Sequence, residues 1–146
     1  MKVNLFFSKD IEKSHAEIYT NELSDNIQKA INLLEDESNN SMIAVKKGKD
    51  ITFLKFNEIY MFRVENKQVM VYTNDDSFLV KKALYQIEEI LDSSFIRISK
   101  STIINLDKID RVAPSLKGMM FIKLKNGLKD NISRKYLPNF KEVIGL

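Results

Sequence analysis

The sequence predicts a mainly β fold with short helices, α+β overall, built from small antiparallel sheets. From residue 42 onward, turn residues recur about every eight to twelve positions, which is typical of short consecutive strands. Too few of these strands are followed by helical patterns for a parallel α/β sheet. The 146 residues suit one ordinary domain with a small appendage.

Residues 1–41 differ from the rest and are predicted to form a β-β-α extension. Residues 3–7 and 16–19 are the two strand candidates. A helix follows, with Thr20 or Ser24 as its N-cap. Its apolar residues recur at the spacing of one helical face, and they are Leu23, Ile27, Ala30, Ile31 and Leu34. This single apolar stripe needs a partner, so we expect the extension to serve dimerisation or regulation.

Residues 42–146 are predicted to form the second domain, after a polar linker that ends at residue 41. Its predicted strands lie at residues 42–46, 51–55, 59–65, 69–73, 78–81, 95–98, 109–113, 119–125 and 128–132. One short helix is marked by Leu84, Ile87, Ile90 and Leu91. Asn126 and Gly127 predict a type I′ turn, because both central residues of that turn need positive φ.

Two local questions remain open at this point. The alternation of residues 95–98 places Phe95 and Arg97 on one face and Ile96 and Ile98 on the other, and either face is compatible with burial. The last segment contains Pro138 and is either a short helix or an irregular tail.

The net charge of +3 conceals a polarised chain. Residues 95–146 carry eleven Lys and Arg against four Asp and Glu, a balance of +7. Residues 1–45 carry four against eight, a balance of −4, and residues 46–94 carry eight of each. A basic region of this kind indicates a polyanionic partner, with nucleic acid first, although a solvated basic surface is the simpler alternative.

The sequence offers little to a catalytic mechanism, so we expect no enzyme. It contains one histidine, His15, and no cysteine, which leaves no thiolate nucleophile and no cysteine-based zinc site. Neither G-x-S-x-G, nor a glycine-rich phosphate loop, nor H-E-x-x-H occurs. Asp107 and Asp110 lie three positions apart with no third ligand nearby, so neither a metal nor another cofactor is expected.

The location predicted for the chain is the cytoplasm. No apolar run approaches the roughly 18–20 residues that span a bilayer. The apolar stretch at the N-terminus is too short for a signal peptide.

Three separated motifs resemble LytTR DNA-binding domains. Residues 95–109, FIRISKSTIINLDKI in one-letter code, are similar to that family's signature, and residues 132–136, ISRKY, are similar to its terminal segment. Residues 59–65, IYMFRVE, match an upstream strand of the family, and residues 124–127 fit a connecting hairpin. The resemblance covers residues 42–146, with the motifs in the right order and spacing.

The resemblance implies a bacterial transcription regulator that is mostly β. Such domains bind DNA with loops at sheet edges, which enter successive major grooves on one side of the duplex. Many members carry a phosphoacceptor receiver domain, for which residues 1–41 are too short, so the chain resembles the stand-alone class. The DNA-binding residues that the resemblance implies are Lys67, Gln68, Ser99, Lys100, Ser101, Ser133, Arg134 and Lys135. Arg97 is added as a DNA-binding candidate from its own position, because it can support Lys100 from the same strand.

The chemistry of these side chains fits contacts with DNA. Arg134 can make a bidentate contact to guanine or clamp a phosphate, and Gln68 can pair with adenine. Lys100 can reach a base or a phosphate, and the serines beside it can donate to phosphate. Purely structural roles are also open: Arg97 can form a salt bridge, and Ser133 can cap the following segment.

Two classes of function follow from these observations. The first is a sequence-specific transcription regulator that binds double-stranded DNA as a homodimer, without a cofactor or a small-molecule substrate, and that receives its signal from an upstream membrane or signalling protein. The alternative is a protein-interaction or sensory module whose basic face binds an acidic partner protein.

Overall fold

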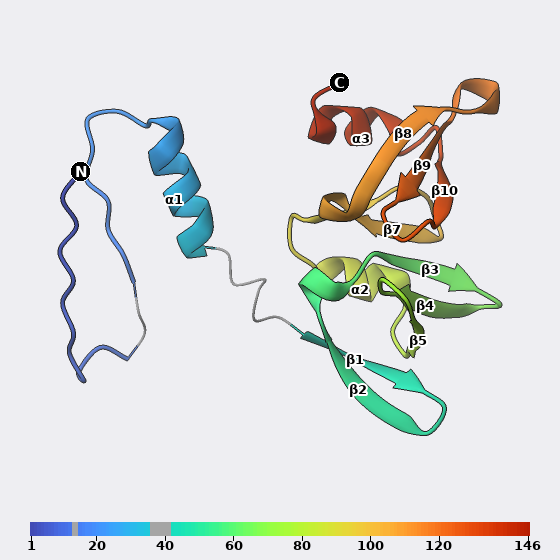
Figure 1. The fold of residues 1–146 in the computed structure, drawn as a ribbon, viewed down its shortest axis with the longest axis horizontal. Coiled ribbons are helices and arrows are strands. Elements are labelled where there is room, and N and C mark those ends of the chain that lie inside the picture. The colour runs from blue at the N-terminus through green and yellow to red at the C-terminus, as the bar shows by residue number, and fades with distance from the viewer. Residues whose placement is uncertain (13–14, 36–41) are drawn as a thin grey trace. The chain divides into compact units, whose positions relative to one another are not determined.

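The computed structural model describes residues 1–12, 15–35 and 42–146, in two units, Met1–Glu37 and Ser38–Leu146. The predicted linker residues 36–41 lie outside the described residues. In the first unit the helix is α1 (Asp25–Glu35), drawn in blue in Figure 1. Ser24 is its N-cap, because its Oγ accepts from Ile27 N at 3.3 Å and its carbonyl accepts from Gln28 N.

The two strands predicted for the first unit are wrong. Residues 3–7 and 16–19 form no strand, and α1 is the only regular element among the described residues of this unit. A strand needs a neighbouring strand to satisfy its backbone groups, and β propensity alone does not supply one. The apolar side chains of the segment remain exposed, with Phe7 at 93%.

The second unit contains a seven-stranded and a three-stranded antiparallel sheet, so the predicted fold class is confirmed (Figure 1). The large sheet has the order β2 (Asp50–Lys55), β1 (Met42–Lys47), β5 (Ser77–Val80), β4 (Gln68–Tyr72), β3 (Met61–Glu65), β7 (Thr102–Asn105) and β6 (Phe95–Arg97). The small sheet has the order β10 (Lys129–Ile132), β9 (Met120–Leu124) and β8 (Ile109–Pro114).

Short helices complete this unit. The α-helices are α2 (Leu84–Ile90) and α3 (Leu137–Ile144), so the final segment is a helix, with Pro138 in its first turn. The 3-10 turns are η2 (Phe56–Glu58), η3 (Leu106–Lys108) and η4 (Leu116–Gly118). Strand β7 was missed by the sequence analysis because all four of its residues are buried, which removes the polar-apolar alternation that marks a strand.

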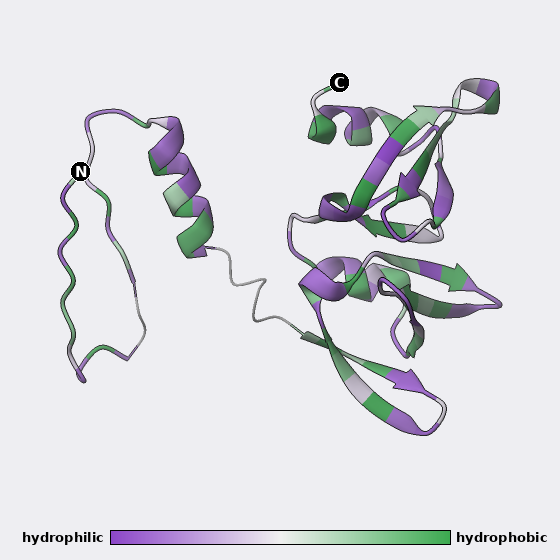
Figure 2. Ribbon diagram, in the orientation of Figure 1, coloured by the Kyte–Doolittle hydropathy of each residue, from purple (hydrophilic) through white to green (hydrophobic). Residues whose placement is uncertain are grey.

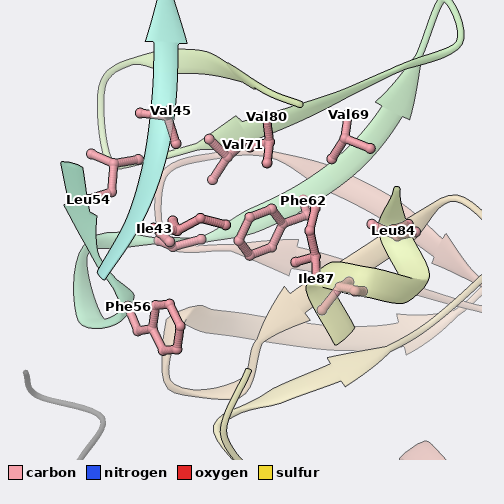
Figure 3. Close-up of a cluster of buried hydrophobic side chains, with 12 residues drawn as sticks. Ile43, Val45, Leu54, Phe56, Phe62, Val69, Val71, Val80, Leu84 and Ile87 are labelled. Atoms are coloured by element: carbon pink, nitrogen blue, oxygen red, sulfur yellow. The ribbon is translucent and has the colours of Figure 1, made fainter. Parts of the chain in front are cut away.

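Two apolar clusters hold the second unit together. The first lies between one face of the large sheet and α2, with Phe62 beside Ile43 and Ile87 (Figure 3). The second lies against the small sheet and α3 and joins Ile96 and Ile98 to Phe140. The face of β6 that carries Ile96 and continues to Ile98 is therefore buried. Figure 2 shows the alternation of apolar and polar residues along the strands that produces these faces.

The tight turn with two left-handed residues is not where the sequence predicts it. Asn66 and Lys67 have φ values of 50° and 62° and join β3 to β4. At the predicted position only Gly127 has a positive φ, of 90°, so the type I′ prediction is wrong there. The side chain of Asn126 explains the difference, because it donates to Thr73 O at 2.9 Å and accepts from Leu128 N, which holds a longer loop.

Replacing the ring at the centre of the first cluster tests this packing. Phe62 is fully buried and its ring lies 6.0 Å from that of Phe95. Phe62→Ala is expected to lower the free energy of unfolding by about 3–5 kcal/mol in urea denaturation, because it removes a large buried side chain and leaves a cavity. Phe53→Ala is the control, since Phe53 is 62% exposed. Equal losses for the two variants would contradict this assignment of the core.

Candidate nucleic-acid interface

The β3–β4 turn carries the first pair of predicted site residues. Lys67 is exposed at the tip of the turn, and Gln68 is exposed at the first position of β4, paired with Glu65. The left-handed backbone at Lys67 costs about 1–2 kcal/mol in a non-glycine residue. A two-residue turn leaves little freedom between the strands, so the tip is held rigidly by the β3–β4 ladder.

The second group of predicted residues forms the loop between β6 and β7. Ile98 N donates to Thr102 O at 3.0 Å and closes the loop, which leaves Lys100 exposed. Ser101 N donates to Ser99 Oγ at 3.2 Å, and the two hydroxyls lie 3.3 Å apart. The loop therefore presents a lysine between two serines that are already hydrogen-bonded to each other.

Arg97 supports this loop from within. Its Nε donates to Ser99 O at 2.9 Å and its Nη2 donates to Lys100 O at 2.5 Å. Its Nη1 pairs with Glu88 of α2 at 2.7 Å. The guanidinium is largely covered, with a side-chain exposure of 19%. The structural role foreseen for Arg97, a salt bridge, is present, and it sets the conformation of the loop that bears Lys100.

The third group leads into α3. Ser133 O accepts from Tyr136 N and Leu137 N, both at 3.0 Å, so Ser133 begins the turn that starts the helix. Lys135 is exposed. Arg134 is also exposed, but its Nε donates to Lys117 O at 2.8 Å and its Nη2 donates to the same oxygen. Arg134 thereby ties the start of α3 to the loop between β8 and β9.

Two backbone hydrogen bonds bring the three groups together. Val64 N, near the end of β3, donates to Ser101 O at 2.8 Å. Ser133 N donates to Ile98 O at 2.9 Å. The β3–β4 turn, the β6–β7 loop and the start of α3 therefore lie in one continuous row of segments, and each segment presents an exposed lysine.

A polar cluster beneath this row was missed by the sequence analysis. Arg63 Nε donates to Glu65 Oε1 at 2.8 Å, and Tyr72 Oη donates to the same oxygen at 2.5 Å. Arg63 also lies 3.8 Å from Asp130 of the small sheet, which accepts from the buried Thr102 Oγ1 at 2.7 Å. This cluster joins the two sheets. The signal for it was the placement of Arg63 and Glu65 two positions apart, on one face of a strand.

The other end of β4 has the opposite charge. The β4–β5 turn carries Asp75 and Asp76, which line a hollow together with Glu58. Lys47 pairs with Asp76 and holds the pKa of that carboxyl below its ordinary value. Because Lys67 immediately precedes β4 and Asp76 follows it, the basic row and this acidic turn lie at opposite ends of one strand. The described residues contain no acidic or histidine cluster that could hold a metal ion.

Comparisons with known proteins show the family of this chain and the fold of its second unit. The family model described as LytTr DNA-binding domain matches residues 49–145. Two relatives, both uncharacterized HTH-type transcriptional regulators of Staphylococcus aureus, strains NCTC 8325 and N315, are 32% and 31% identical over the whole chain and 99% of their own length. A solved LytTr DNA-binding domain from Bacillus cereus has a TM-score of 0.69 at 22% identity and covers 73% of this chain and 98% of its own.

The relatives' names include HTH, but the helices described in the second unit are not arranged as a helix-turn-helix. Strands β6 to β10 separate α2 from α3 in the sequence. The helices described in this unit therefore do not form the consecutive pair of a helix-turn-helix. None of the helices within the described ranges is long and apolar enough to cross a bilayer.

The polar cluster predicts a pH-dependent contribution to stability. The hydrogen bond from Tyr72, followed by that from Arg63, lowers the pKa of Glu65. A carboxyl with a lowered pKa stabilises the fold above its unfolded value of about 4.3, and this contribution is lost as pH falls through the folded pKa. Glu65→Gln is therefore expected to reduce the urea midpoint at pH 7, and its difference from wild type is expected to shrink as the pH falls below about 4.3.

Glu89→Gln is the matched control for that experiment. Glu89 is an exposed residue of α2 and lies outside the cluster. Its substitution is expected to change the midpoint little at either pH. If the urea midpoints of Glu65→Gln and wild type differed by the same amount at pH 7 and at pH 3, the charge of Glu65 would contribute nothing to stability.

Proposed function

Because this chain belongs to the LytTR DNA-binding domain family and is a DNA-binding transcription regulator, we propose that it reads DNA through the row of basic segments described above. The supporting observation is the pair of hydrogen bonds, Val64 to Ser101 and Ser133 to Ile98. They hold three lysine-bearing segments side by side. Such a row of cations can meet several phosphates of one DNA duplex at once.

In this proposal each segment has its own role. Lys67 and Gln68 contact DNA from the β3–β4 turn, and Lys100 does so from the β6–β7 loop, where a lysine can donate to guanine or to phosphate. Lys135 contacts DNA from the start of α3. The hydroxyls of Ser99, Ser101 and Ser133 donate to phosphates and set the register.

Arg97 has an indirect role in the same proposal. Its three hydrogen bonds all go to protein atoms, two to carbonyls of the loop and one to Glu88. It therefore supports Lys100 by fixing the loop. A rigid loop loses less conformational entropy when it binds, which favours affinity.

We further propose how the whole chain acts. Residues 42–146 form the DNA-binding domain, and residues 1–41 form a unit for dimerisation or regulation. The exposed apolar residues Leu33 and Leu34 of α1, with Leu23 just before it, would then meet a second copy, and the spacing of half-sites would follow from the dimer. The protein works in the cytoplasm, by binding and without catalysis, downstream of a membrane or signalling protein.

Removing the lysine of the central loop tests the interface. Duplexes selected from a random pool by the full chain supply the target sequence. Lys100→Ala is expected to weaken binding to the selected duplex by about 1–3 kcal/mol, because it removes a contact from the middle of the row. Binding titrations at two salt concentrations measure the loss.

Lys49→Ala is the matched control. Lys49 is exposed in the β1–β2 turn, two positions after Lys47, which pairs with Asp76 at the acidic end of β4. Its removal changes the net charge equally and is expected to leave affinity close to wild type. Equal losses for both variants would count against the proposed interface. If wild type bound none of the duplexes even at low salt, an acidic partner protein would replace DNA in the proposal.

A further inference from the structure

We propose that Lys117, in the β8–β9 loop, is a further contact to the DNA backbone, and that Arg134 is the residue that positions it. The sequence alone gives Lys117 no evident role and predicts that Arg134 contacts DNA directly. This inference rests on the proposed function and extends its interface by one segment.

The backbone of Lys117 is the first observation. Its φ and ψ are 60° and 35°, in the left-handed region. In the described part of the chain the non-glycine residues with positive φ are Asn66, Lys67 and Lys117, so two of the three are lysines at hairpin tips. Glycine or asparagine would adopt this conformation at lower cost. Strained residues of this kind concentrate at functional sites.

The contact with Arg134 is the second observation. Both Nε and Nη2 of Arg134 donate to the carbonyl oxygen of Lys117. Hydrogen bonds from a guanidinium are stronger than those between neutral groups. Within the loop, Ser115 N donates to Met119 O at 2.8 Å, which closes it at its base. The loop is therefore fixed at its base and at its tip, and the guanidinium is committed to a backbone atom.

The position of the loop is the third observation. Arg134 follows Ser133, whose N–H donates to Ile98 O beside the loop of Lys100. The contact of Arg134 with Lys117 thus adds the β8–β9 loop to the row. Lys117 is exposed and pairs with no carboxylate among the described residues. An exposed ammonium on a rigid tip next to other cations is suited to a phosphate.

Lys117→Gly in the full chain is the direct test. Glycine removes the ammonium and suits the left-handed backbone, so the thermal midpoint should not fall. On the duplex selected by wild type, the slope of log K against log salt is expected to become shallower by about 0.9, the value for one phosphate. Between 50 and 200 mM salt, affinity would then fall about 3.5-fold less than for wild type. The loss should be similar on scrambled duplexes, and Lys49→Ala should keep the wild-type slope.

A double-mutant cycle tests the positioning role. Arg134→Ala alone is expected to make the slope of log K against log salt shallower, as Lys117→Gly does, because the β8–β9 loop is no longer held in place. In the Lys117→Gly background it should have little further effect. A full additional loss there, with relaxed preference at one base pair, would show that Arg134 reads DNA directly and would overturn its positioning role.

The inference and the proposed function fail in different ways. If wild type binds duplex DNA and Lys117→Gly keeps the wild-type slope and affinity, Lys117 is a solvated turn lysine and the inference is wrong, while the proposed function stands. If wild type itself binds no duplex, both fail together.

Discussion

The apolar core between the two sheets is the constraint on which the candidate interface depends. Met61 and Ile104 of the large sheet are fully buried in the same cluster as Ile122 and Ile132 of the small sheet and Phe140 of α3. The β3–β4 turn and the β6–β7 loop extend from the large sheet, whereas the β8–β9 loop belongs to the small one and the basic start of α3 follows it. This shared packing sets the distances between the two sheets and therefore between their loops, because close-packed interiors permit little sliding.

Polar contacts also join the two sheets. Asp130 of β10 accepts from Thr102 of β7 and lies beside Arg63 of β3, so the two sheets are joined at the edge of the apolar cluster. Hydrogen bonds are directional and the hydrophobic effect is not. The polar cluster of Arg63, Thr102 and Asp130 can therefore specify how one sheet is rotated on the other. The buried isoleucines supply most of the favourable free energy.

In the loops, arginines hold the backbone in place and lysines are exposed to solvent. Arg97 and Arg134 donate most of their hydrogen bonds to carbonyl oxygens of nearby loops. Lysines occupy the exposed positions of those loops. Arginine suits the first task because its planar group donates in a fixed geometry, and lysine suits the second as a mobile point charge. This division explains how short loops on a small scaffold can present cations in defined places.

The sequence by itself determined the amphipathic elements and the charge. The period-2 strands from residue 42, the helix with Leu84 and Ile87 on one face, and the basic last third follow from local chemistry. Tertiary structure decided the rest. Residues 3–7 have strand propensity and no partner, and β7 has partners on both sides and no alternation. The pairing of Arg134 with Lys117, seventeen residues away, leaves no local pattern at all, because a contact between distant segments depends on how the sheets pack.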